Sequence, residues 1–280
     1  MRNVTYIEVE KLKPFENHPY YVKDDDEMMN LTQSIKENGI LSPLIVRPIE
    51  NNEYEVISGH RRLYAGIKAG MDKVPALIYE MDRDAAVIAL VDSNLHRDNV
   101  LPSERAFAYK MKMEALSHQG KRIDLTSAQV EPKLSAEIIG KSENISRETV
   151  KRYIRLTNLL PKFLEYVDEG RIAFTPAVEL SYLNDIEQQD LIQTIESEDC
   201  TPSLSQAVRM KKLSQAGELD DDKIFEIMSE EKANQKERIK IPTERVRKYF
   251  PESYTKSQIE DAIVKLCEAN YKRRQKQQER

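Results

Sequence analysis

Several residue types are scarce in this chain of 280 residues, and each shortage narrows what the protein can be. It contains no Trp, and its two cysteines, Cys200 and Cys267, form no C-x-x-C pair. Such sparse cysteine usage is typical of a reducing compartment and disfavours a thiolate zinc site. No spacing of a zinc motif occurs among the four histidines, which are His18, His60, His96 and His118.

Long apolar runs are also missing. No stretch approaches the roughly 18 residues that a membrane-spanning helix needs. The first residues, MRNVTYIEVEKLKPF, contain no apolar segment after the basic start, so a signal peptide is not expected. We therefore expect a cytoplasmic protein without a membrane partner.

Charge is abundant, at 32% of residues, but it is unevenly placed. Residues 1–100 carry 12 basic and 17 acidic side chains, whereas residues 133–157 have a net charge of +3. In the last eleven residues, five basic side chains stand against one acidic side chain. Local positive charge on an otherwise acidic body is typical of elements that contact DNA, although the net charge of −5 alone would not suggest it.

Hydrophobic periodicity predicts a small α+β domain over residues 1–100, followed by helices. Its strands are expected at 4–9, 44–48, 53–58 and 74–79, and its helices at 27–38, 61–69 and 84–95. Tyr20 and Tyr21, beside the acidic residues 24–26, are expected to lie on solvated surface.

An all-α domain is predicted over residues 101–214. Its helices are expected at 103–119, 134–140, 146–158, 161–168, 175–182, 185–197 and 203–214. Residues 120–133 read as a loop and residues 215–240 as a charged linker with one short helix at 222–229. A C-terminal segment, 241–280, contains a long amphipathic helix at 255–278, which we expect to assemble with a second copy; a solvated C-terminus is the alternative.

The first motif that carries chemistry is the run of residues 57–62 (ISGHRR). A strand ends, Gly59 turns the chain, and a helix begins with Arg61 and Arg62 in its first turn. Free backbone N–H groups at a helix N-terminus and two fixed cations make an anion-binding corner. The alternative is a helix that simply begins with two surface arginines.

The second motif, residues 92–97 (DSNLHR), ends a helix with Asn94 and Arg97. Taken alone, it is best explained as a helix C-terminus with a favourable cation.

The third motif, residues 134–156 (LSAEIIGKSENISRETVKRYIRL), predicts a helix-turn-helix. Gly140 is expected to end the first helix and Ser146 to cap the second. The turn at 141–145 is longer than the usual three or four residues. If Val150 and Ile154 pack inward, DNA contacts are expected from Ser146, Arg147, Thr149, Lys151, Arg152 and Arg155. The alternative is two packed helices with a solvated basic face.

Together these motifs resemble the ParB family of partition proteins. Residues 39–47 (GILSPLIVR), 54–65 (YEVISGHRRLYA) and 94–97 (NLHR) resemble the ParB N-terminal domain, which shares its fold with sulfiredoxin. Residues 153–161 and 169–173 resemble the helix-turn-helix domain of the family. The chain most resembles ParB-like proteins of plasmids and mobile elements in low-GC Gram-positive bacteria. This resemblance continues into residues 248–254 (KYFPESY) and the C-terminal tail.

The resemblance implies a nucleotide-gated DNA clamp. It implies CTP and Mg²⁺ as cofactors, double-stranded DNA as a ligand, a homodimer, a ParA-type ATPase as a partner and association with the nucleoid. In the family, CTP closes the dimer into a clamp that slides away from its DNA site. The residues matched to nucleotide binding are Gly59, His60, Arg61, Arg62, Asn94 and Arg97, with Asn94 also matched to the metal.

Three departures from the family pattern bear on activity. His60 and Ser93 stand where the family usually has Glu, which leaves open whether the protein is a weak CTP hydrolase or only binds CTP. Residues 175–179 (TPAVE) replace a Gly-His-Ala-Arg signature. A ParB-like transcription regulator without nucleotide switching is therefore the alternative. A sulfiredoxin reaction is disfavoured because no cysteine precedes Cys200, and an amino-acid kinase would not need a helix-turn-helix.

Overall fold

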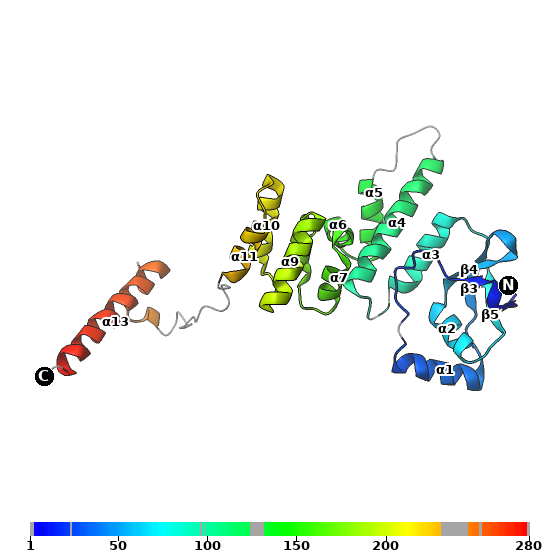
Figure 1. Ribbon diagram of the computed structural model, residues 1–280, viewed down its shortest axis with the longest axis horizontal. Helices are drawn as coiled ribbons and strands as arrows, with labels where there is room; N and C mark the ends of the chain where they lie inside the picture. Colours follow the sequence, from blue (N-terminus) through cyan, green and yellow to red (C-terminus); the bar gives the residue numbers. More distant parts are fainter. Residues whose placement is uncertain are drawn as a thin grey trace. The chain divides into compact units, whose positions relative to one another are not determined.

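The computed structural model describes residues 3–22, 24–95, 97, 99–123, 132–230, 246–251 and 254–278 (Figure 1). By its internal contacts the chain divides into two units, Met1–Glu230 and Glu231–Arg280. Among the described residues, no helix is both long enough and apolar enough to cross a membrane.

The N-terminal part of the first unit is built on a five-stranded mixed sheet. Its order is β1-β5-β3-β4-β2, with β1–β5 and β3–β4 antiparallel and the other two pairs parallel. The strands are β1 (Thr5–Glu8), β2 (Leu12–Lys13), β3 (Leu44–Pro48), β4 (Tyr54–Ser58) and β5 (Lys73–Ile78). Four of them correspond to predicted strands. The two-residue β2 is too short to show a periodicity, which is why the sequence did not indicate it.

Three helices accompany this sheet, α1 (Asp26–Asn38), α2 (His60–Lys68) and α3 (Arg83–Leu95) (Figure 1). The side chain of Asp25 caps α1 by accepting from Met28 N at 3.0 Å. Successive residues of β4 face opposite sides of the sheet. Val56 therefore packs in a cluster with α1 and α2, whereas Ile57 packs in a second cluster with α3.

That second cluster continues beyond the predicted domain limit at residue 100. It joins Ile57 and Leu90 to Tyr109 of α4 (Pro102–Ile123), Ile139 of α5 (Pro132–Ser142) and Val150 of α6 (Arg147–Arg155). The N-terminal region and the beginning of the helical region thus share apolar contacts. A displacement of α3 would therefore be transmitted to α4, α5 and α6 through these contacts.

Further helices complete the first unit, and all of them except α5 contribute to a third cluster that includes Phe163, Leu180 and Leu191. They are α4 (Pro102–Ile123), α5 (Pro132–Ser142), α6 (Arg147–Arg155), α7 (Pro161–Asp168), α8 (Phe174–Leu180), α9 (Asp185–Glu198), α10 (Leu204–Ala216) and α11 (Asp221–Ser229), with a 3-10 turn at Leu156–Asn158. Helix α4 extends into the stretch expected to be a loop, and residues 124–131 lie outside the described part of the chain.

The stretch predicted as a charged linker begins as packed structure. Helix α11 buries Ile224, Ile227 and Met228 in the same cluster as α9 and α10, with Asp220 as its N-cap. Three apolar residues at helical spacing outweigh the surrounding charge because their burial is favourable. Packed chain therefore runs to about Ser229, and the rest of the expected linker, to residue 240, is outside the described residues.

The second unit contains one long helix, α13 (Lys256–Gln278), close to the predicted 255–278. Ile259 is buried, but Val264, Leu266 and Tyr271 are exposed. Whether this helix assembles with a second copy remains a prediction.

Candidate nucleotide-binding and DNA-binding sites

Gly59 sets the geometry of the first site. It has φ 104° and ψ 22°, and it is the residue before the first turn of α2. A Cβ there would lie 3.1 Å from Leu44 Cγ and 3.2 Å from Arg62 Nη2, so both conformation and space favour glycine. The turn brings His60, Arg61 and Arg62 together at the N-terminus of α2, as the sequence predicted.

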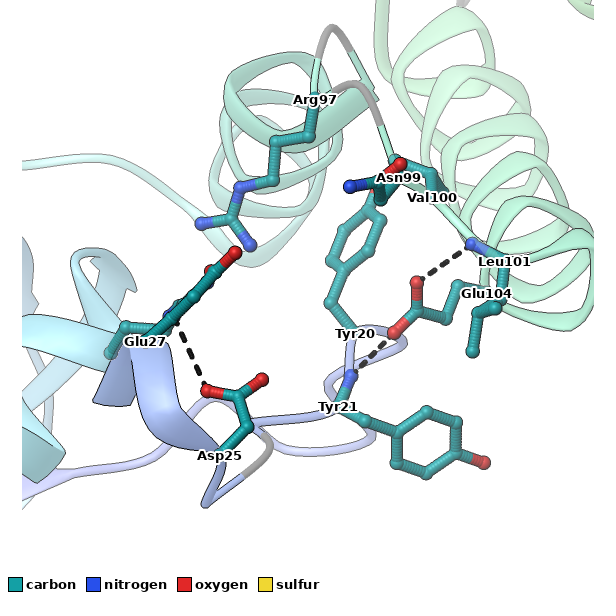
Figure 2. A pocket seen from close by; sticks show the side chains of 10 residues that line it. Tyr20, Tyr21, Asp25, Glu27, Arg97, Asn99, Val100, Leu101 and Glu104 are labelled. Atoms are coloured by element: carbon teal, nitrogen blue, oxygen red, sulfur yellow. Dashed lines mark hydrogen bonds and ion pairs between the residues drawn. The ribbon is translucent and has the colours of Figure 1, made fainter. Parts of the chain in front are cut away.

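A cavity of about 550 Å³ opens beside this turn (Figure 2). Arg61 comes to it from α2, and Arg97 points into it from the segment after α3. Its lining consists of Tyr20, Tyr21, Asp25, Glu27, Arg61, Arg97, Asn99, Val100, Leu101 and Glu104. The cavity therefore lies between the N-terminal region and the beginning of α4.

Three carboxylates share the cavity with the two arginines. Arg61 Nη2 lies 3.1 Å from Glu27 Oε2 and 3.9 Å from Asp25 Oδ1. Glu104 accepts from the backbone N–H groups of Tyr21, at 2.7 Å, and Leu101, at 3.0 Å (Figure 2). Glu104 is thus held by the backbone, whereas Glu27 is an exposed side chain that a stronger anion can displace from Arg61.

Only Arg61 and Arg97 of the six matched residues line the cavity, and Arg62 and Asn94 make hydrogen bonds elsewhere. Arg62 Nη1 donates to the carbonyl oxygens of Ser42 and Pro43, and burial followed by the charge of Arg97 lowers its pKa. Asn94 is 3% exposed and its Nδ2 donates to Leu90 O at 2.7 Å. Neither lines the cavity in this structure. Their predicted roles toward nucleotide and metal remain predictions.

His60 is half-buried and its ring lies against that of His18, with 3.9 Å between the ring centroids and 55° between the ring planes. Burial, then the neighbouring His18 and Arg97, lower the pKa of His60 to about 3. Burial also lowers the pKa of His18, so both rings are neutral at pH 7. The contact between His18 and His60 could not be predicted, because a single histidine in a polar loop gives no sequence signal.

Tyr20, Tyr21 and Asp25 were expected to form solvated surface, and for Tyr20 this was wrong. Tyr20 is 4% exposed, and its ring packs with α3 and α4 in the second cluster. Burial raises the pKa of its hydroxyl, which keeps it protonated. The loop before α1 thus forms one wall of the cavity, which a polar composition did not reveal.

The cavity contains groups that can bind phosphate, although three carboxylates share it with them. Two guanidinium groups and a helix N-terminus are donors for phosphate oxygens. Among the described residues, no group of three or more His, Cys, Asp or Glu side chains is arranged to hold a metal.

The helix-turn-helix comprises α5 and α6, and Gly140 acts differently from the prediction. Helix α5 does not end there but continues to Ser142, which shortens the turn to residues 143–146. A Cβ at Gly140 would lie 2.8 Å from Ile145 O, so glycine is needed for close approach of the turn. Ser146 caps α6 as predicted, by accepting from Thr149 N at 3.0 Å.

The predicted DNA-contacting residues of α6 divide into two groups. Arg147 and Lys151 are partly exposed and both reach Glu148, at 3.1 and 3.4 Å. Their hydrogen bonds and charges, those of Arg147 first, lower the pKa of Glu148. Such exposed pairs are weak, so both cations are available to an approaching phosphate.

Arg152 and Arg155 instead brace α6 against α8. Arg152 Nη2 donates to Thr175 Oγ1 at 3.1 Å, at the start of the segment that departs from the family signature. Arg155 donates to Ser181 O at 3.0 Å, and its guanidinium lies 3.9 Å from the Tyr182 ring centroid. These contacts hold α6 against α8 and the residues that follow it, a role that the charges of the two arginines do not indicate.

Comparison with known proteins agrees with this architecture. Residues 1–95 match the family described as the ParB N-terminal domain. The chain is 28% identical to a probable chromosome-partitioning protein ParB of Pseudomonas putida, over 76% of this chain and 68% of that protein. It is 30% identical to a nucleoid occlusion protein of Listeria innocua, over 70% of this chain and 64% of that protein.

Two crystal structures of C-terminally truncated ParB from Caulobacter crescentus are also similar. The one complexed to the centromeric parS site has 22% identity and a TM-score of 0.42, over 76% of this chain and 99% of that one. The one complexed with CTP-γ-S has 25% identity and a TM-score of 0.32, over 69% and 99%.

Residues 1–95 therefore form a ParB N-terminal domain. Beyond that domain, the chain is similar in sequence to a ParB partition protein and a nucleoid occlusion protein over 70–76% of its length.

Proposed function

We propose that this protein is a ParB-type DNA-binding partition protein whose cavity beside α2 binds CTP together with Mg²⁺. The observation that carries the proposal is the convergence of Arg61 and Arg97, from separate elements, on one cavity at a helix N-terminus. Two arginines and the positive end of a helix can share the charge of a triphosphate. The choice of CTP rests on the likeness of residues 54–65 and 94–97 to ParB motifs.

The position of the cavity supports a gating role. Leu101 and Glu104 line it at the beginning of α4, and α4 shares the second cluster with α5 and α6. A nucleotide in the cavity would contact both the N-terminal region and the helix that supports the DNA-binding pair. We propose that this contact closes a homodimer around double-stranded DNA, with a ParA-type ATPase as the partner in segregation.

At the DNA, we propose that the N-terminus of α6 enters the major groove. Ser146, Arg147, Thr149 and Lys151 are exposed or partly exposed there, and we expect Arg147 and Lys151 to reach phosphates or base edges. Arg152 and Arg155 keep α6 in place. This arrangement separates residues whose loss weakens DNA contacts from residues whose loss moves the whole helix.

Isothermal titration calorimetry with CTP, ATP and GTP, each with Mg²⁺, tests the nucleotide site. We expect selective binding of CTP, weakened by about 10- to 100-fold in Arg61→Ala or Arg97→Ala, as charge-assisted hydrogen bonds of about 1.5–3 kcal/mol imply. Arg209→Ala is the matched control, because Arg209 is an exposed arginine on α10 paired with Glu230. If Arg61→Ala and Arg97→Ala both bind CTP as tightly as the unmodified protein, the cavity is not the nucleotide site.

A ParB-like regulator that binds DNA without nucleotide switching is the second candidate. Two observations favour it. Glu27 already forms an ion pair with Arg61, and Asn94 Nδ2 already donates to the carbonyl oxygen of Leu90. Footprinting on the protein's DNA site separates the two. Protection that spreads from the site only with CTP supports the clamp, whereas one fixed footprint with or without CTP supports the regulator.

A further inference from the structure

Tyr182, which follows the end of α8, is contacted by two cations from different helices. The guanidinium of Arg155, the last residue of α6, lies 3.9 Å from the centre of the Tyr182 ring. The ammonium of Lys211, on α10, lies 3.6 Å from the same centre. Both distances are within the range of cation–π contacts. One aromatic ring therefore brings together positive charge from the helix-turn-helix and from a helix much further along the chain.

These three residues and Glu179 form a group, the Tyr182 cluster, that contains two cations and one anion. Lys211 Nζ pairs with Glu179 Oε2 at 2.9 Å. Arg155 donates to the hydroxyl of Ser181 at 3.2 Å and to its carbonyl oxygen at 3.0 Å, which uses two of the five N–H donors of the guanidinium. Tyr182 is 38% exposed, and the Lys211 side chain is 23% exposed. The cluster therefore offers positive charge, N–H donors and a phenol hydroxyl at the surface, which suits a phosphate.

The cluster continues the proposed DNA face of α6. Arg147, Lys151 and Arg155 are spaced by four residues, so they lie along one side of that helix. At 1.5 Å per residue, Arg155 is about 12 Å further along the axis than Arg147. The major groove of DNA is only about 8.5 Å deep. With the N-terminus of α6 in the groove, its C-terminal end and the Tyr182 cluster come to the level of the phosphates that border the groove.

We propose that Lys211 and Tyr182 contact these bordering phosphates, so that α10 belongs to the DNA interface together with α6. The inference rests on the proposed DNA-binding function and extends its surface. Lys211 supplies the charge, and the Tyr182 hydroxyl donates to a phosphate oxygen. A phosphate can replace Glu179 as the partner of Lys211, because a solvent-accessible ion pair is weak.

Fluorescence anisotropy with a labelled duplex of mixed sequence measures this contact in the full chain. Lys211→Ala should weaken binding by about 3- to 10-fold and reduce the slope of log K against log salt concentration by about 0.9, as the loss of one phosphate contact implies. Lys211→Arg, which keeps the charge, should restore both quantities. Arg209→Ala is the matched control. Arg209 is also on α10 and also pairs with a glutamate, but two residues from Lys211 it lies on the opposite side of the helix.

A double variant distinguishes a direct phosphate contact from mere support of α6. If Lys211 has a phosphate of its own, Lys151→Ala and Lys211→Ala together should reduce the slope by about 1.8. A double variant that behaves like Lys151→Ala alone would show that Lys211 only holds α6 in place, which overturns the proposal. Glu179→Gln tests the opposite sign, because it releases Lys211 without removing it. DNA binding should then become tighter, by up to about fivefold.

The outcomes separate this inference from the function beneath it. If Lys211→Ala binds DNA like the unmodified protein while Lys151→Ala binds more weakly, the α10 contact is refuted and the DNA face of α6 stands. If the unmodified protein binds no DNA, both are refuted. If Lys211→Ala binds DNA normally but has lost a binding of poly-glutamate that the unmodified protein shows, the cluster receives an acidic protein segment instead. Should Lys211→Ala fail to fold, Glu179→Gln decides: unaltered or weaker DNA binding overturns the proposal.

Discussion

Replacing Glu55 by Ala should strongly destabilise the sheet beside the cavity. Glu55 lies in β4 and is 5% exposed. Its carboxylate accepts from Arg47 Nε and from Arg83 Nη1, both at 2.7 Å. Removing it leaves the Arg47 side chain, 14% exposed, without its partner. Breaking a buried pair costs about 3–5 kcal/mol, and we expect the lower end because Arg83 is 38% exposed and can turn to water.

Glu53→Ala is the matched control for this prediction. Glu53 lies next to the same strand and pairs with Lys13 at 3.0 Å, but the two side chains are 32% and 45% exposed. Such a pair contributes about 1 kcal/mol at most. Urea unfolding followed by circular dichroism should therefore separate the variants by about 2 kcal/mol or more, close to 1 M in the midpoint for a slope of about 2 kcal/mol/M. Equal midpoints would refute the argument from burial.

Two further predictions concern the helix-turn-helix. Lys151→Ala should weaken DNA binding at all sequences and reduce the slope of log K against log salt concentration by about 0.9. The control Lys162→Ala, on α7, should change neither quantity. An unaltered slope in Lys151→Ala would show that Lys151 does not contact DNA phosphates. Gly140→Ala should lower the melting temperature even though Ala favours a helix over Gly by about 1 kcal/mol, because its Cβ meets Ile145 O at 2.8 Å. A higher melting temperature would contradict the close approach, and Lys141→Ala, at the exposed neighbouring position, controls for helix propensity.

Features fixed by local chemistry could be predicted from the sequence. The turn at Gly59 follows from a strand, a glycine and two arginines in succession, and the Ser146 cap follows from a serine before a basic amphipathic helix. Most helices and strands were found for the same reason, since their apolar periodicity is a local signal. Gly140 shows the limit of that approach. A glycine near a helix end usually ends the helix, but here a close backbone contact requires it.

Features made by tertiary contacts could not be predicted. The cavity wall formed by Tyr20 and Glu104 joins residues far apart in the sequence, and nothing in either neighbourhood indicates that they meet. The same holds for Arg155, whose partners Ser181 and Tyr182 belong to the segment around the end of α8. Its charge predicts a DNA contact, which stays a prediction; the hydrogen bond with Ser181 and the contact with the Tyr182 ring could not be foreseen from that charge.

An energetic argument explains why Arg62, unlike Arg61 and Arg97, does not line the cavity in this structure. Arg62 donates to two backbone carbonyls in this structure, and each such hydrogen bond contributes about 1 kcal/mol net. A hydrogen bond between a guanidinium and a phosphate is roughly twice as strong. A triphosphate held by Arg61 and Arg97 would therefore compete for Arg62, and Arg62 could turn only by releasing Ser42 and Pro43. Because those residues precede β3, nucleotide binding at the cavity would also affect the start of the central strand of the sheet.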